Sequence, residues 1–160
     1  FHNAYEGGYI DHILNVYENS LEMVRIFAKR GGKINFTKEE LVFAALHHDL
    51  GKIGDLDAPY YLPQESEWHR NKLGELYKKN SNPFINIEDR TFWLLNQYNI
   101  KYTKNEMLGI KLADGLFADG NAQYLKNSDE FPIHTALPYL IHWADHMACV
   151  TEKLNLFFSL

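Results

Sequence analysis

Apolar and polar residues alternate along much of the chain with the spacing of amphipathic helices. Between Gly8 and about Lys29, apolar side chains recur at intervals of three and four residues and form two flanks of one helix. Gly31 and Gly32 follow, and glycine is common just after the end of a helix. His12 lies on the second apolar flank. The pattern therefore predicts that His12 faces the interior of the protein.

Further helices are predicted from capping signals and apolar spacing. Thr37 and Thr103 each precede a glutamate by three residues, which is the capping-box pattern at a helix start. Two longer stretches, 53–67 and 115–133, are polar or broken by glycine and proline and are predicted as loops. The first loop is expected to form a lid or a wall beside the site. The predicted helices span about residues 8–29, 37–50, 65–79, 87–98, 103–113 and 135–158.

These patterns predict an all-α fold. Neither a strand-length alternation nor an internal repeat competes with the helical pattern. With 160 residues and 46% hydrophobic content, the chain fits one compact bundle of about five to six helices over residues 1–160. Because it starts at Phe1 rather than Met, we expect N-terminal residues to be missing from it.

Charge and cysteine content narrow the functional classes. The formal net charge is -5, from 16 basic and 21 acidic residues, and the basic residues form no cluster. Long nucleic acids are therefore disfavoured as partners, because phosphate neutralisation supplies most non-specific affinity. Cys149 is the only cysteine, which favours a reducing cytoplasm. No stretch has the length and apolarity of a membrane span, so no membrane partner is predicted.

One short segment contains several side chains that could bind a metal ion or take part in catalysis. The apolar run 41–46 is followed by His47, His48 and Asp49. An ionised Asp49 left unpaired at the end of a buried helix costs at least several kcal/mol, so a positive group is expected beside it. Imidazole and carboxylate together suit a divalent ion. The alternative is that Asp49 bonds to a backbone group or a lysine and that His48 is a satisfied core residue.

His12 comes first, His48-Asp49-Leu50-Gly51-Lys52 follows, and Asp145 lies in a late predicted helix. This order, with its His-Asp-x-Gly-Lys motif, resembles that of the HD superfamily of metal-dependent phosphohydrolases. The opening segment 1–12 is similar to the entry motif H-A-Y-x-G-G-L-L-x-H. The resemblance implies that four side chains bind one divalent ion, Mn, Co, Ni, Fe or Mg. These ligands are His12, His48, Asp49 and Asp145.

Further residues are candidates for catalysis or substrate binding. Lys52 is expected to hold a substrate phosphate, and the alternative for it is a surface lysine. Asp49 or a nearby acid is expected to accept a proton during catalysis. His69 is a candidate phosphate contact or general acid. Asp114 stands where related proteins carry histidines that help to hold a second ion, so the number of ions stays open. The remaining candidates for substrate binding are His2, Arg70, Asp114 and His142.

The resemblance implies phosphoester hydrolysis. A small phosphorylated substrate, most simply a 5'-(deoxy)nucleotide phosphomonoester, is favoured because aromatic residues near the site could stack on a base. These residues are Tyr5, Tyr60, Tyr61 and Trp68. The alternatives are a phosphodiesterase or nuclease of the same superfamily and a non-catalytic nucleotide sensor. Exposed aromatic side chains could also form a homo-oligomer interface.

Overall fold

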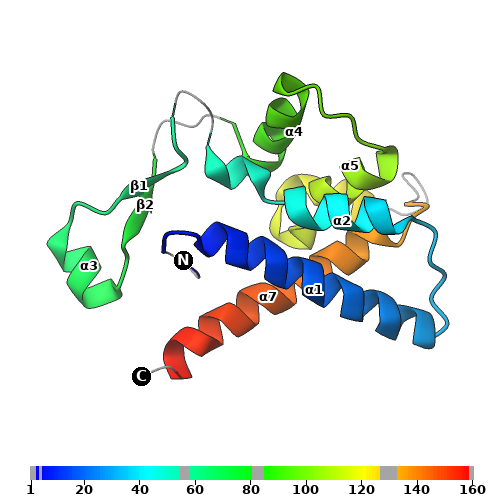
Figure 1. Ribbon diagram of the computed structural model, residues 1–160, viewed down its shortest axis with the longest axis horizontal. Coiled ribbons are helices and arrows are strands. Elements are labelled where there is room, and N and C mark those ends of the chain that lie inside the picture. The colour runs from blue at the N-terminus through cyan, green and yellow to red at the C-terminus, as the bar shows by residue number, and fades with distance from the viewer. Residues whose placement is uncertain (1–2, 4, 55–57, 81–84, 127–132, 159–160) are drawn as a thin grey trace.

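Two long helices cross at the centre of the molecule (Figure 1). α1 (Gly8–Lys29) packs against α7 (Leu137–Phe158), and each has 22 residues. α2 (Lys38–His47) lies on α1, and α5 (Lys104–Lys111) packs against both α2 and α7. The all-α prediction is confirmed. The computed structural model describes residues 3, 5–54, 58–80, 85–126 and 133–158.

Small side chains let these helices approach closely. Ala44 and Ala45 on α2, and Ala144 and Ala148 on α7, are fully buried in one core. Asn19 on α1 donates a hydrogen bond from Nδ2 to the carbonyl oxygen of Ala144 at 3.2 Å, which fixes the α1–α7 crossing. Among the described helices, none combines the length and the apolarity needed to cross a bilayer.

α2 ends earlier than predicted. The capping box at Thr37 is present, but the helix ends at His47 rather than Leu50, and a 3₁₀ turn follows at Leu50–Ile53. This turn packs on α4 (Ile87–Gln97). Asp49 lies between the two elements with φ -108° and ψ 12°. Its backbone therefore leaves the helical path, so Asp49 does not point where a continued α-helix would send it.

A small arm projects from the bundle (Figure 1). It consists of β1 (Tyr61–Pro63), α3 (Glu67–Leu73) and β2 (Tyr77–Lys79). The strands are antiparallel, with Tyr61 opposite Lys79 and Pro63 opposite Tyr77. The predicted helix over 65–79 is wrong in its second half. Gly74 adopts a left-handed conformation with φ 66° and ends α3 there.

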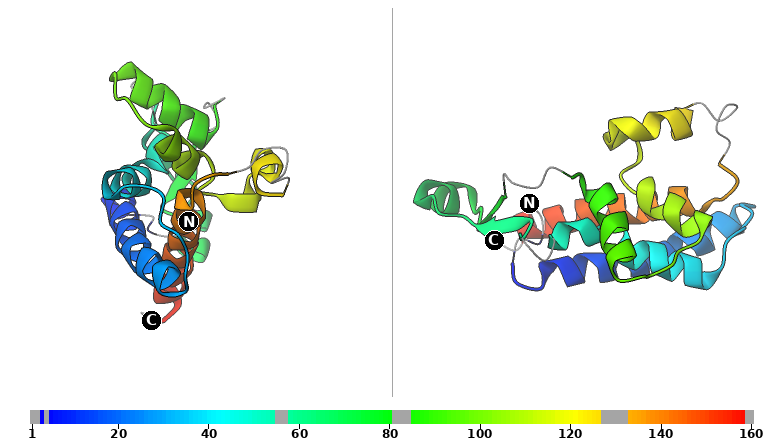
Figure 2. Two further views of the ribbon diagram at one scale, coloured as in Figure 1. Left: turned by 90° about the vertical axis from the view of Figure 1, so that its right-hand side faces the viewer. Right: turned by 90° about the horizontal axis from the view of Figure 1, so that it is seen from above.

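The stretch predicted as a long loop over 115–133 is also partly ordered. It holds short 3₁₀ turns at Gly115–Phe117 and Asp119–Asn121, followed by α6 (Ala122–Lys126), while residues 127–132 lie outside the described part. Figure 2 shows α6 beside the bundle. Asn121 is buried and donates from Nδ2 to the carbonyl oxygen of Gly115 at 3.0 Å. This bond stabilises the turn that a polar sequence had suggested was irregular.

Candidate metal centre

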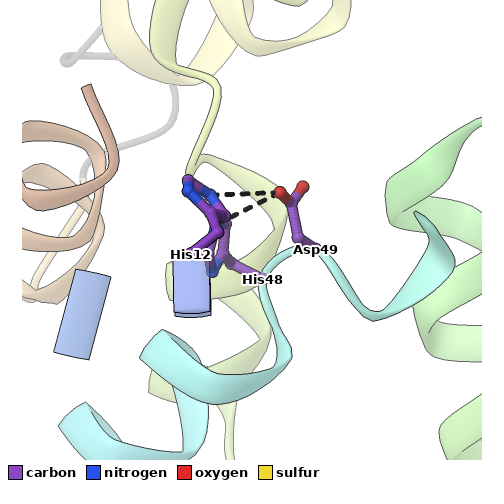
Figure 3. A group of neighbouring side chains, drawn as sticks. All are labelled: His12, His48 and Asp49. Atoms are coloured by element: carbon purple, nitrogen blue, oxygen red, sulfur yellow. Dashed lines mark ion pairs between the residues drawn. The ribbon is translucent and has the colours of Figure 1, made fainter. Parts of the chain in front are cut away.

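Three side chains meet at the end of α2 (Figure 3). His48 is the C-cap residue of α2, Asp49 follows it, and His12 comes from α1. Nε2 of His12 lies 3.4 Å from Oδ2 of Asp49, and Nε2 of His48 lies 3.6 Å from the same oxygen. All three side chains are buried. The break in the helix after His48 brings these adjacent residues to one point.

Asp145 on α7 completes the group. Its Oδ1 lies 3.2 Å from Nε2 of His12 and 3.6 Å from Nε2 of His48. The two imidazole nitrogens therefore face two carboxylates across a shared space. The four residues that the sequence predicted as ligands come together from α1, α2 and α7.

The second nitrogen of each imidazole ring faces an acceptor outside this space. Nδ1 of His48 donates to the carbonyl oxygen of Ala45 at 2.8 Å. Nδ1 of His12 faces both carboxylate oxygens of Glu152, at 3.1 and 3.2 Å. Because each acceptor requires a hydrogen on Nδ1, the Nε2 atoms of the neutral rings carry their lone pairs toward the centre.

This arrangement fits a divalent ion. Neighbouring donors on an octahedral ion with bonds of about 2.1 Å lie about 3 Å apart, close to the observed separations of 3.2–3.6 Å. Nε2 of His48 is buried and has no hydrogen-bond partner among the described residues. A buried polar atom without a partner is costly, and coordination of a cation would satisfy it. The donor set of two imidazoles and two carboxylates suits Mn, Co, Ni or Fe, and also Mg.

The electrostatics of the cluster also call for a cation. Burial lowers the pKa of His12, but the carboxylates of Asp145 and Asp49 outweigh this effect and raise the pKa to about 10. Burial raises the pKa of Asp49, whereas His48 and Lys52 hold it well below its usual range. Without a metal, a proton on His12 therefore balances part of the buried negative charge.

The thiol of Cys149 stands next to this set. Its Sγ donates to Oδ1 of Asp145 at 3.5 Å. Burial and the charge of Asp145 raise the pKa of Cys149 to about 12, so it remains a neutral thiol at physiological pH. His12, Asp145 and Cys149 also form a group whose ligand atoms lie close enough together to hold an ion.

The cluster borders a cavity of about 480 Å³. His12 and Asp49 reach it from the buried side, and Lys52 lines it with its ammonium group paired to Oδ2 of Asp49. Burial lowers the pKa of Lys52, but Asp49 more than compensates and raises it above its ordinary value. Lys52 thus keeps its positive charge beside the cluster. The other lining residues are Asn3, Tyr5, Gly8, Tyr9, Ile53, Tyr61, Tyr77, Lys79, Ile87 and Asp114.

Asp114 enters the cavity from a turn that His142 holds in place. Nδ1 of His142 donates to the carbonyl oxygen of Ala113 at 2.7 Å. Gly115 has φ 54°, and a Cβ atom there would lie 2.4 Å from Cε1 of His142, so only glycine fits. Burial and the negative charges of Asp49 and Glu88 raise the pKa of Asp114. His142 was predicted to bind substrate, whereas its observed contacts are with this turn.

Some predicted residues lie away from the cluster. His69 and Arg70 are on α3, at the end of the arm, and neither lines the cavity. Nδ1 of His69 bonds to Ser66 at 2.8 Å. Trp68 is 59% exposed on the same helix. His2 lies outside the described residues.

Of the aromatic residues predicted to stack on a base, some line the cavity and others do not. Tyr5 and Tyr61 line the cavity as predicted for base stacking, and Tyr9 and Tyr77 join them without having been predicted. Tyr60 is buried instead, with the guanidinium carbon of Arg90 5.3 Å from the centre of its ring. This contact fixes the base of the arm to α4.

Sequence reasoning also missed Glu152. A signal was available, since Glu152 follows Asp145 by seven residues in an apolar helix, which places both acids on one face. Lys79 was missed as well, because its segment was assigned to a helix rather than to a strand that borders the cavity.

Comparison with known proteins gives one family match. The model of the HD domain family matches residues 9–119, a range that contains His12, His48 and Asp49. Neither curated proteins nor solved structures give a match. Asp145 lies beyond the matched range, and the structure brings it to the other three residues. With the family model covering more than half of the sequence, the chain belongs to the HD domain family of metal-dependent phosphohydrolases.

Proposed function

We propose that this protein removes the phosphate group from a nucleotide, most simply a 5'-(deoxy)nucleotide phosphomonoester. One observation carries the proposal: four potential metal ligands meet beside a 480 Å³ cavity that Lys52 and several tyrosines also line. The cluster and Lys52 suit a phosphate, and the tyrosine rings suit a flat organic group. A cavity of this volume accommodates a small ligand rather than a long strand.

The residues of the chain have distinct parts in this reaction. His12, His48, Asp49 and Asp145 would hold a divalent ion, which would supply Lewis acidity that acidifies water and offsets the negative charge of the phosphoryl oxygens. Lys52 donates hydrogen bonds to phosphoryl oxygens from its position beside Asp49. Asp49 accepts a hydrogen bond from the attacking water and receives its proton. A bond from the water oxygen to phosphorus forms as the ester bond breaks.

Asp114 is the proposed general acid. It lines the cavity, and its raised pKa favours the protonated form that a proton donor needs. Asp114 gives its proton to the leaving oxygen, so that the nucleoside departs as a neutral alcohol. The proton that Asp49 takes from water balances the one that Asp114 loses.

The tyrosines supply the basis for choosing a nucleotide. Tyr5 and Tyr9 come from the N-terminal side of the cavity, and Tyr61 and Tyr77 come from the two strands of the arm. Aromatic rings from these two parts of the chain can stack on a base, a contact worth about 0.5–1.5 kcal/mol per ring pair beyond area burial. The same rings have no favourable partner in a phosphorylated short-chain alcohol.

The proposal also covers the domain organisation, the cellular compartment, the metal ion and the oligomeric state. We infer one catalytic domain acting in a reducing cytoplasm, because a chain with a single cysteine can form no disulfide within itself. Mn, Co, Ni, Fe and Mg are the candidate ions. Homo-oligomer formation through exposed aromatic side chains stays a prediction, to be measured by light scattering.

Phosphate release is the direct test. The panel consists of ribo- and deoxyribonucleoside monophosphates and triphosphates, ribose 5-phosphate, glycerol phosphate and a diester, each with Mn, Co, Ni and Mg. Release from a monophosphate should need metal and should disappear in Asp49→Asn. Glu22→Gln is the matched control, because Glu22 is an exposed acid on α1 whose ion pair is with Arg25.

The panel also separates the alternatives. Release from the diester alone would replace the nucleotidase proposal with a phosphodiesterase, and bound metal without any release would indicate a sensor. If stacking selects the substrate, Tyr61→Ala should lower kcat/KM for the nucleotide about tenfold and leave glycerol phosphate unchanged. Tyr98→Ala, an exposed tyrosine at the end of α4, is the control.

A further inference from the structure

Glu152 forms a buried hydrogen-bonded unit with His12 and Asn15. Only 6% of Glu152 is exposed, and its two carboxylate oxygens lie 3.1 and 3.2 Å from Nδ1 of His12. Nδ2 of Asn15 donates to Oε1 of Glu152 at 2.9 Å. Two side chains of α1 therefore hold this carboxylate of α7 in place.

Helix geometry explains why these residues meet. His12 and Asn15 are three residues apart on α1, so their side chains share a face. Asp145 and Glu152 are seven residues apart on α7, which is about two turns. Where α1 crosses α7, the imidazole of His12 lies between the two acids: Asp145 faces Nε2 and Glu152 faces Nδ1.

The two acids impose different roles on the two nitrogens. A carboxylate only accepts hydrogen bonds, so Glu152 keeps a hydrogen on Nδ1. The lone pair of the neutral ring then resides on Nε2, the atom that faces Asp145 and Asp49. An outer carboxylate of this kind orients a ligating imidazole and strengthens it as a donor.

We propose that Glu152, held by Asn15, is a positioning residue that makes His12 an Nε2 metal ligand. This inference rests on the proposed function, since it concerns the same metal centre. His48 receives its orientation from the carbonyl oxygen of Ala45, which no side-chain substitution removes. The two imidazoles thus differ in a useful way, because only the orientation of His12 depends on a side chain that can be replaced.

The test is a set of metal affinities measured by calorimetry with Mn²⁺ on the full chain. Glu152→Ala should raise the Kd about 10–100-fold, the range typical of such outer partners. Glu152→Gln keeps an oxygen acceptor for Nδ1 and should recover most of the affinity. Glu106→Ala is the control for loss of a buried glutamate, because Glu106 caps α5 and has no contact with His12. It should lower thermal stability without changing the Kd.

Two further measurements separate positioning from a general loss of structure. In a double-mutant cycle, Asn15→Ala should weaken binding in the native background and add nothing in the Glu152→Ala background. In ¹⁵N NMR of the zinc-loaded protein, His12 should carry its proton on Nδ1, and this proton should exchange faster in Glu152→Ala while that of His48 does not.

The outcomes are distinct. An unchanged Kd in folded Glu152→Ala, or equal effects of Asn15→Ala in both backgrounds, would overturn the role of Glu152 alone. A native protein that binds none of the divalent ions would overturn the proposed function together with it.

Discussion

A hydrogen bond of 2.8 Å joins the backbone N–H of Gly51 to Oγ1 of Thr91. The guanidinium of the adjacent Arg90 donates to the carbonyl oxygen of Gly51 at 3.4 Å. The turn that carries Asp49 and Lys52 is therefore fixed to α4, a helix that supplies none of the four candidate ligands. Packing on α4 is what holds Asp49 against the crossing of α1 and α7.

Gly51→Ala should destabilise the protein. The added Cβ would lie 2.1 Å from the carbonyl oxygen of Ile87, so the turn and α4 have to separate. We expect the free energy of unfolding to fall by about 1–3 kcal/mol, measured by urea denaturation. Gly120→Ala, where a Cβ meets nothing within 4 Å, should stay within about 0.5 kcal/mol. Equal effects of the two substitutions would contradict this account.

Metal affinity should increase with pH. In the metal-free protein the pKa of His12 is raised to about 10, so His12 is protonated at neutral pH and loses its proton when a metal binds. For each proton that the metal displaces, the apparent Kd should fall about tenfold for every unit by which the pH rises, up to about pH 10. Calorimetry in buffers of different ionisation enthalpy counts these protons. Binding at pH 7 without proton release would count against His12 as a ligand.

The stability of the metal-free protein should decrease as the pH rises. Since folding raises the pKa of His12 from 6.5 to about 10, its contribution is complete below about pH 6.5 and disappears as the pH rises through 10. Thermal unfolding between pH 6 and 10 should show a falling Tm in chelator and a flatter profile in excess Mn²⁺. A rising Tm in chelator over this range would contradict the assignment.

Lys52→Met should separate catalysis from metal binding. Loss of the ammonium group removes a donor to the phosphate, and kcat/KM should fall about 10²–10³-fold. Metal affinity should be kept or improved, because Lys52 no longer competes for Oδ2 of Asp49. Lys78→Met is the control, since Lys78 pairs with the exposed Glu65 on the arm. Steady-state kinetics and calorimetry on the same preparations provide both values.

His69→Ala and Arg70→Ala should leave kcat/KM within about twofold of the native value. Both residues lie on α3, and the described contacts of His69 are with Ser66 and Trp68 on the arm itself. A loss of 100-fold or more in phosphate release would show that the arm closes over the cavity during turnover. It would also restore the role that the sequence predicted for these residues.

The sequence was most informative where a helix has a strong pattern of its own. The bounds of α1 and the capping boxes of α2 and α5 are confirmed, because apolar spacing and caps act within a few residues. The arm could not be predicted in this way. Each of its strands has three residues, too few for an alternating pattern, and each is stabilised by a partner distant in sequence.

In the candidate site, too, local sequence patterns were informative and contacts between distant segments were not predictable. His48 and Asp49 were predicted from the cost of burying an acid beside an apolar run, which is a local argument. His69 was predicted to act at the site but lies on α3, and the position of α3 depends on the contact between Tyr60 and Arg90 at the base of the arm. Glu152 was missed because its importance depends on the α1–α7 crossing.

The crossing of α1 and α7 also constrains how the protein is made. α7 follows every other described element, and it supplies both Asp145 and Glu152. On the ribosome, His12, His48 and Asp49 emerge well before these partners, so a nascent chain holds an incomplete donor set. An ion bound once α7 has emerged would join an early helix to α7 and close a long loop of chain. Cofactor uptake would then have to wait for the emergence of α7.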